Sequence, residues 1–301
     1  MDGGFIGASC AAGFLFRMLL APVIHVRGLR KRYDDLEAVR GVDLSVGQGE
    51  IVAFLGPNGA GKTTILEILE GHRRRDSGEV TVLGFDPERS PRALRERIGI
   101  VPQETAVEPV LTVRETVELY AAAYPRPRPA EEVIALVDLD GQRDTRVSAL
   151  SGGQQRRLDL AIGIAGDPEL LFLDEPTTGF DPSARRRSWE LIRRLGSLGK
   201  TVMLTTHYME EAQQLAERVV VIAAGEIVAD STPDTLSSDG TAVISFRVSS
   251  ERVTYRTETP QEALLSMLLW AQRTGTRLEG LTVTQPTLED VYLELTNGAH
   301  E

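Results

Sequence analysis

The segment from residue 51 to residue 71 constrains the fold of this chain more than any other part. The apolar run at 51–55 has the length of a buried strand, and a helical pattern begins near Lys62 and stops at Gly71. The loop between them, G-P-N-G-A-G-K-T, matches the pattern G-x-x-x-x-G-K-[ST] in full. Because the loop lies between a strand and a helix, as the pattern requires, a phosphate-binding loop is predicted rather than a chance glycine-rich turn.

The residues of this loop have defined roles in the prediction. Glycines let backbone N–H groups turn inward around phosphate oxygens, and the N-terminus of the following helix adds a partial positive charge. Lys62 is expected to reach the β- and γ-phosphates of ATP, and the Thr63 hydroxyl to ligate Mg²⁺. The predicted nucleotide-binding residues of the loop are Gly56, Pro57, Asn58, Gly59, Ala60, Gly61, Lys62, Thr63 and Thr64.

The rest of the chain up to about residue 230 alternates between strand-like and helical patterns. Strands are expected at 23–26, 39–46, 51–55, 79–83, 98–101, 170–173, 201–205 and 219–222. The stretch 112–165 is helical, with one break at the prolines near 125–129. Strands that alternate with helices predict an α/β fold with a mainly parallel sheet covered on both faces.

Residues 231–301 differ in pattern and predict a small α+β appendage. A half-buried strand is expected at 243–248, a helix at 263–271, a short strand at 281–283 and a helix at 287–295. Thr287 and Asp290 stand at capping-box spacing at the start of that last helix.

Two more motifs carry chemistry. The apolar strand ending at 173 delivers Asp174 and Glu175 to its carboxyl end, where ligands of open α/β sheets bind. Asp174 suits the outer shell of Mg²⁺, and Glu175 is placed to act as the base that polarises a water beside the γ-phosphate. The second motif is Ser151-Gly152-Gly153-Gln154, which predicts an N-capped helix and a second anion site at its N-terminus. One chain needs no second γ-phosphate site unless two chains share the nucleotides.

Composition narrows the function classes. The formal net charge is −11 over 301 residues, which argues against a nucleic-acid partner. The basic runs at 73–75 and 185–187 are interpreted as solvated helix ends, with contact to a partner or to membrane head groups as the alternative. Cys10 is the only cysteine, so no disulfide can form within the chain and a reducing compartment fits.

The first 22 residues are predicted to be a poorly ordered extension. They are mostly apolar, but Arg17, Pro22 and glycines interrupt the run, and no basic cluster precedes it. Translation starting at Met18 is a second interpretation, and a membrane anchor is the third.

The order of these motifs resembles the ATP-binding subunits of ABC transporters. L-S-G-G-Q at 150–154, about twenty residues before the Asp174–Glu175 pair, resembles the family's signature motif. The resemblance implies that Tyr33 stacks on adenine, that Gln103 senses Mg²⁺ and the membrane partner, that Asp181 lies in the loop crossing a dimer interface, and that His207 contacts the γ-phosphate. It covers roughly residues 23–230, with a helical subdomain at about 104–165. Phe180 stands where the family more often has leucine.

The resemblance also implies an assembly. Two chains would pair head to tail around ATP and Mg²⁺, with Thr63, Gln103 and Asp174 near the metal. Ser151, Gly152, Gly153 and Gln154 of one chain would face the nucleotide of the other. Such a dimer works on a separate membrane permease, at the cytoplasmic face of the membrane.

The C-terminal residues indicate a subfamily of these ATPases. T-L-E-D-V-Y-L-E-L at 287–295 resembles the tail of single-domain ATPases of ABC-2-type exporters, including daunorubicin-type resistance systems. Export powered through a separate permease is therefore expected, with the cargo left open among drug, lipid and polysaccharide. The alternatives are a soluble ABC-type ATPase that acts on ribosomes or DNA, and a regulatory switch with little turnover, against which Glu175 and His207 argue.

Overall fold

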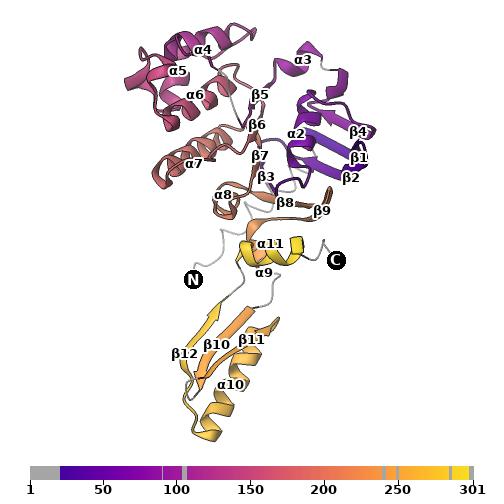
Figure 1. Cartoon of the computed structure of the whole chain (residues 1–301), viewed down its shortest axis with the longest axis vertical. Helices are drawn as coiled ribbons and strands as arrows, with labels where there is room; N and C mark the ends of the chain where they lie inside the picture. Colours follow the sequence, from indigo (N-terminus) through magenta and orange to yellow (C-terminus); the bar gives the residue numbers. More distant parts are fainter. Residues whose placement is uncertain are drawn as a thin grey trace, which may run out of the picture. The chain divides into compact units, whose positions relative to one another are not determined.

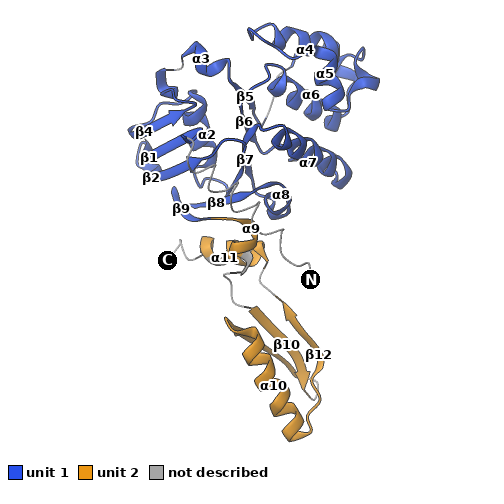
Figure 2. Cartoon of the chain, turned by 180° about the vertical axis from the view of Figure 1, so that it is seen from behind, with its two compact units in different colours: residues 1–230 blue, residues 231–301 orange. Residues whose placement is uncertain are grey.

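The computed structural model describes residues 21–89, 91–103, 107–238, 242–248, 251–284 and 287–297. The predictions for the N-terminal extension and for Cys10 lie outside these residues, apart from positions 21 and 22. The chain divides into two compact units after residue 230 (Figure 2). Within the described ranges, the helices are all too short or too polar to cross a bilayer.

The first unit begins with a small antiparallel sheet. Its strands are β1 (Ile24–Tyr33), β2 (Leu36–Val46) and β4 (Ser77–Val82), in the order β2-β1-β4. β1 extends well beyond the predicted end at 26, because its ladder with β2 continues through the polar residues up to Tyr33. This sheet is separate from the parallel sheet that the sequence predicts.

A six-stranded sheet forms the centre of the first unit, in the order β5-β6-β7-β3-β8-β9. Its strands are β3 (Ile51–Leu55), β5 (Ile98–Val101), β6 (Leu170–Asp174), β7 (Thr201–Thr206), β8 (Arg218–Ala223) and β9 (Glu226–Ser231). The pairings among β5, β6, β7, β3 and β8 are all parallel, so the carboxyl ends of these strands share one edge. β9, which the sequence analysis did not predict, follows a tight turn at Ala224 and Gly225, both with positive φ.

Helices flank this central sheet. α2 (Lys62–Glu70) lies between the two sheets, and its residues Ile65, Leu66 and Leu69 share one hydrophobic core with both. α7 (Pro182–Ser197) and α8 (Met209–Leu215) pack against β7. Figure 1 shows α2 on one side of the central strands and α7 on the other. A short helix, α3 (Arg92–Arg95), precedes β5.

A helical group is formed by α4 (Val113–Ala121), α5 (Ala130–Leu136) and α6 (Gly152–Ile164), which contact one another, and α6 also packs on β5 (Figure 1). The sequence predicted one break in this stretch, and the structure has a second between α5 and α6. There Asp138 has a φ of 54°, and two single 3₁₀ turns lie at 140–142 and 147–149. α6 restarts at Ser151, whose side chain accepts a hydrogen bond from the Gln154 N–H in a capping box.

The second unit is a three-stranded antiparallel sheet with helices, as predicted in outline. β10 (Ala242–Val248), β11 (Glu251–Thr257) and β12 (Glu279–Thr284) lie in the order β11-β10-β12, and α10 (Pro260–Thr274) packs against β10. α9 (Pro233–Ser238) and α11 (Leu288–Asn297) contact each other. Thr287 and Asp290 cap α11 reciprocally, as their spacing predicts. β11 and α9 were not predicted.

Candidate nucleotide site

The phosphate loop is shaped by backbone packed tightly against its glycines. A Cβ atom at Gly56 would lie 2.4 Å from the Ile222 carbonyl oxygen, and one at Gly61 would lie 2.4 Å from the carbonyl oxygen of Ala38. Gly61 also has a φ of 102°, which side chains disfavour. Backbone carbonyl groups of β2 and β8 therefore pack directly against the glycines of the loop.

The N-terminus of α2 is open to an anion. Gly61 is its N-cap and supplies no side-chain hydrogen bond, and the first turn contains no acidic residue. Lys62 is 6% exposed, and its Nζ donates to the carbonyl oxygens of Gly56 (2.7 Å) and Pro57 (3.1 Å). Burial lowers the pKa of Lys62, and the nearby charges of Glu175 and Asp174 act in the opposite direction.

Asp174 and Glu175 lie at the end of β6, next to Thr205 on β7. The Thr205 hydroxyl donates to Asp174 Oδ1 and accepts from the Glu175 N–H at 3.0 Å, while the Thr205 carbonyl accepts from the same N–H at 3.2 Å. Glu175 has a φ of 47°, an uncommon conformation for a residue with a side chain. Thr205, which is fully buried, thus bonds the carboxylate of Asp174 and the backbone of Glu175.

Three side chains converge on the carboxylate of Glu175. The Gln103 amide lies 3.5 Å from Oε2, the Thr178 hydroxyl donates to Oε2 at 3.0 Å, and His207 Nδ1 lies 3.3 Å from Oε1. Gln103 follows β5, and His207 follows β7, so the parallel topology explains the meeting at the strand ends. The side chain of Glu175 is only 13% exposed.

His207 is held in turn by an aromatic neighbour. Its ring centroid lies 4.1 Å from that of Tyr208, and the guanidinium carbon of Arg185 lies 4.2 Å from the Tyr208 centroid. Arg185 comes from the first turns of α7, just after Asp181. The interpretation of the 185–187 run as a solvated helix end is therefore wrong for Arg185.

Tyr33 lies at the end of β1 beside basic side chains. The guanidinium carbon of Arg73 is 5.2 Å from its ring centroid, and Lys31 Nζ is 5.6 Å away. Arg73 also bonds Glu67 at 2.5 Å, and Arg75 bonds both oxygens of Asp86 at 2.8 Å. Two of the three arginines at 73–75 thus have partners within the chain, which corrects the interpretation of that run as a solvated helix end.

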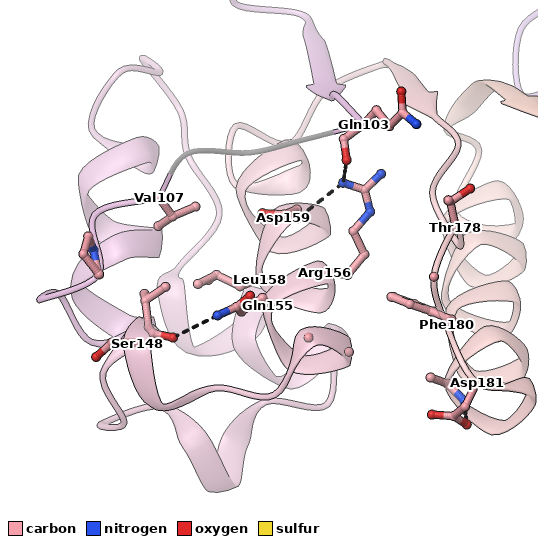
Figure 3. A pocket seen from close by; sticks show the side chains of 16 residues that line it. Gln103, Val107, Ser148, Gln155, Arg156, Leu158, Asp159, Thr178, Phe180 and Asp181 are labelled. Atoms are coloured by element: carbon pink, nitrogen blue, oxygen red, sulfur yellow. Dashed lines mark hydrogen bonds and ion pairs between the residues drawn. The ribbon is translucent and has the colours of Figure 1, made fainter.

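The signature residues and Asp181 gather at a different place. Gly152, Gly153, Asp181 and Gln103 line a pocket of about 590 Å³ between α6 and the start of α7 (Figure 3). Asp181 caps α7, and the N–H groups of Ala184 and Ser183 lower the pKa of its carboxyl. Phe180 also lines this pocket. The phosphate loop is not among the lining residues, so these two predicted sets of residues lie apart in one chain.

Three polar residues of this region carry no role in the sequence analysis. They are Thr178, Thr205 and Arg156, all of which contact the segment 174–176 or the side chains it carries. Thr178 stands in P-T-T-G directly after the carboxylates, a short polar turn that could have indicated a contact. Thr205 reads as one β-branched residue of a buried strand, so nothing local distinguishes its hydroxyl.

Thr205→Val is expected to reduce the turnover number for ATP about tenfold, because an isosteric methyl removes the hydroxyl that positions Asp174 and Glu175. Steady-state ATP hydrolysis measures the effect. Thr201→Val is the matched control, since Thr201 is equally buried and its hydroxyl accepts from Gly49 N–H at the far end of the same strand. Equal losses in both variants would show that the effect is one of stability alone.

Among the residues that the structure describes, no group of three or more His, Cys, Asp or Glu side chains is arranged to hold a metal ion. Mg²⁺ in nucleotide sites is commonly bound through one or two carboxylates together with substrate phosphates and water.

Comparisons with known proteins agree with this geometry. A family model described as "ABC transporter" matches residues 39–178, and one described as "ABC transporter domain-containing protein-like, C-terminal domain" matches residues 227–287. The chain is 40% identical to a daunorubicin resistance ATP-binding protein of Streptomyces coeruleorubidus, covering 91% of this chain and 94% of the relative. It is 38% identical to a Nod factor export ATP-binding protein I of Burkholderia pseudomallei, covering 93% and 98%.

Solved structures agree in fold. A dimeric bacterial ABC transporter cassette is 28% identical, with a TM-score of 0.62, and covers 69% of this chain and 98% of its own. An ATP-binding subunit of an ABC transporter that is 22% identical covers 91% of this chain with a TM-score of 0.68 and shows the fold alone. The predicted fold class and the resemblance drawn from the motifs are confirmed. By its identity to relatives over nearly the whole length, the chain belongs to the ATP-binding proteins of ABC transporters, a family of ATPases.

Proposed function

We propose that this chain binds and hydrolyses ATP to power export through a separate membrane permease. The observation that carries the proposal is the convergence of three side chains on Glu175. Gln103, Thr178 and His207 all lie within 3.5 Å of its carboxylate. They lie at the edge of the sheet where the parallel strands end, and β3 leads into the phosphate loop at the same edge. The relatives named for daunorubicin resistance and for Nod factor export each cover more than 90% of this chain, so part of the tail after residue 230 is included in the likeness. We assign residues 23–230 to the ATPase domain and 231–301 to an accessory domain.

The proposed chemistry assigns a role to each group. Lys62 and the N–H groups at the start of α2 bind the phosphates, and the neutralised charge makes the γ-phosphorus easier to attack. Glu175 accepts the proton that water loses as its oxygen forms the new bond to phosphorus and the bond to the β-phosphate oxygen breaks. His207 contacts the γ-phosphate, and Tyr33 stacks on adenine.

The residues fit Mg²⁺ held jointly with the nucleotide. Thr63 is exposed in the first turn of α2, and Asp174 ends β6 with one of its oxygens engaged by Thr205. With the amide of Gln103, these side chains offer a hydroxyl, a carboxylate and an amide oxygen, which are hard ligands of the kind that Mg²⁺ prefers. When bound, Mg²⁺ would neutralise charge on the β- and γ-phosphates.

The separation between the signature residues and the phosphate loop supports a head-to-tail dimer. Ser151, with Gly152, Gly153 and Gln154, would complete the site of a second chain, and Asp181 would lie in the interface. The first turn of α6 suits that role, because its N-terminal N–H groups can bind an anion. The dimer would act at the cytoplasmic face of the membrane, with the permease docked near Gln103.

The cargo is a separate question. The relatives are named for daunorubicin resistance and for Nod factor export, so similar ATPases serve chemically different cargoes. The alternative of a soluble ATPase acting on ribosomes or DNA has no observation in its favour, and the net charge of −11 argues against the DNA version.

Co-purification tests the proposal. A tagged Glu175→Gln chain, incubated with ATP and extracted with detergent from native membranes, is expected to retain a multi-span membrane protein in near-equal amount. Omitting ATP, or adding Lys62→Ala to the same chain, should release that partner if the nucleotide holds the assembly together. Recovery of ribosomal or DNA-associated proteins without a membrane protein would overturn the export proposal and leave the ATPase activity intact.

A further inference from the structure

Arg156, five residues into α6, is a buried cation without a role in the chemistry described so far. The residue is 8% exposed, and its side chain donates hydrogen bonds to five backbone carbonyl oxygens. Nη1 reaches Pro102 at 2.7 Å and Gln103 at 3.1 Å, Nη2 reaches Asp174 at 3.0 Å and Glu175 at 3.2 Å, and Nε reaches Pro176 at 3.3 Å. Figure 3 shows the guanidinium reaching from α6 towards Gln103.

These five acceptors belong to only two loops. One loop follows β5 and carries Gln103, and the other begins at Asp174, the last residue of β6, and carries Glu175. A planar guanidinium has five N–H groups in a fixed fork, so it can hold two loops in one register, which a single-point donor cannot do. The neighbouring carboxylate of Asp159, 3.4 Å from Nη1, gives the buried cation a charged partner.

The helix that carries Arg156 also packs on β5. A Cβ atom at Gly99 of β5 would lie 2.1 Å from the Gly163 carbonyl oxygen, so the far end of α6 lies directly on the strand that leads to Gln103. The near end of α6 begins at Ser151 with a capping box. Arg156 thus joins both loops to a helix whose first turn bears the signature residues.

We propose that Arg156 is a positioning residue that couples the two ATP sites of the dimer. This inference rests on the proposed function, in which Gln103 and Glu175 serve the chain's own nucleotide while Ser151 and its neighbours serve the partner's. When Gln103 and Glu175 engage ATP, their loop carbonyls shift, and the guanidinium carries α6 with them. The signature residues then reach the second nucleotide in their productive position, so occupation of one site favours turnover at the other.

The test compares Arg156→Lys with Arg157→Lys. An ammonium group has three N–H groups and no planar fork, so it cannot reproduce the five hydrogen bonds that the guanidinium makes to the two loops. Arg157 is the adjacent arginine of the same helix, and its Nη1 donates to the Asp138 carbonyl oxygen at 2.8 Å, away from both loops. Arg156→Lys is expected to lower the Hill coefficient for ATP hydrolysis from above 1 to about 1, with the turnover number about tenfold lower and the ATP affinity of the monomer unchanged. Arg157→Lys should keep the wild-type Hill coefficient.

A mixed dimer separates coupling from simple damage. One chain carries Glu175→Gln together with Arg156→Lys, and the other is wild type, so hydrolysis comes only from the site whose own loops are intact. Turnover at that site is expected to be about tenfold lower than in a mixed dimer of one wild-type chain and one chain that carries Glu175→Gln alone. Thermal unfolding identifies a variant that fails to fold, in which case Arg156→Gln replaces it.

Three results would overturn the coupling role: a wild-type Hill coefficient of 1, an unchanged Hill coefficient in Arg156→Lys, or unchanged turnover in the mixed dimer. Each of these leaves the proposed function standing, provided that the wild-type chain hydrolyses ATP. A wild-type chain that co-purifies with no permease, while Arg156→Lys still lowers the Hill coefficient, would remove the export proposal and keep the coupling.

Discussion

Glu175→Gln is expected to bind ATP with nearly wild-type affinity and to hydrolyse it about 10²- to 10⁴-fold more slowly, the range of a lost general base. The amide has nearly the shape of the carboxylate, so Thr178 and Gln103 can still bond to the side chain at 3.0 and 3.5 Å. What disappears is the group that accepts the proton of the attacking water. The variant should also accumulate as an ATP-bound dimer, since the step that would release the dimer no longer occurs.

Single-turnover hydrolysis of radiolabelled ATP measures the chemical step, and gel filtration with ATP measures the dimer. Glu210→Gln is the matched control, because Glu210 is an exposed acid in the first turn of α8, just after His207. Hydrolysis by Glu175→Gln at close to the wild-type rate would rule out Glu175 as the base. Loss of ATP binding in this variant would instead indicate that the carboxylate shapes the phosphate site.

Lys62→Ala is expected to weaken ATP binding by roughly tenfold to 150-fold, the equivalent of about 1.5–3 kcal/mol for a hydrogen bond to a charged group. Lys62 is the buried cation of the phosphate loop, with its ammonium already held at the mouth of the loop by Gly56 and Pro57. When ATP binds, the Lys62 ammonium is expected to donate to phosphate oxygens in place of these two carbonyl oxygens. The phosphate oxygens are charged acceptors and form stronger hydrogen bonds than the neutral carbonyls do.

Isothermal titration with ATP in the presence of Mg²⁺ measures the loss. Arg74→Ala removes an exposed cation beyond the other end of α2 and should leave the affinity within about twofold, as expected for a screened surface charge. Equal effects of the two substitutions would mean that Lys62 acts only through net charge. Thermal unfolding without nucleotide should show that Lys62→Ala remains folded.

The parts that local sequence determines were predicted well. The strand, loop and helix around Lys62 follow from an apolar run, a glycine pattern and a 3.6-residue period, and the structure places β3 and α2 at 51–55 and 62–70. The meeting of Gln103, Glu175 and His207 follows as soon as the strands are parallel, because each residue lies one or two positions after a strand of that sheet. Their roles in catalysis stay predictions.

Parts that depend on partners distant in the sequence were not predicted. β1 pairs antiparallel with both β2 and β4, although many other strands could have been its partners. The periodicity of the sequence within each strand does not indicate which strand it pairs with. Thr205 and Arg156 are similar cases. A threonine in a buried strand and an arginine in a run of polar residues look ordinary, and only the folded chain brings each one to the backbone of 174–176.

The carbonyl group of Ala38 affects the interpretation of inactive variants of this enzyme. It faces both Gly61 and Gly225, and a side chain at either glycine would come within 2.4 or 2.9 Å of its oxygen. Substitutions at these two positions therefore act as steric probes of one shared backbone contact, although only one of them belongs to a nucleotide motif. A survey of tolerated mutations would therefore group Gly225 with the phosphate loop, because both positions are sterically crowded. An inactive variant with a side chain at Gly61 would carry no information about how phosphate is recognised.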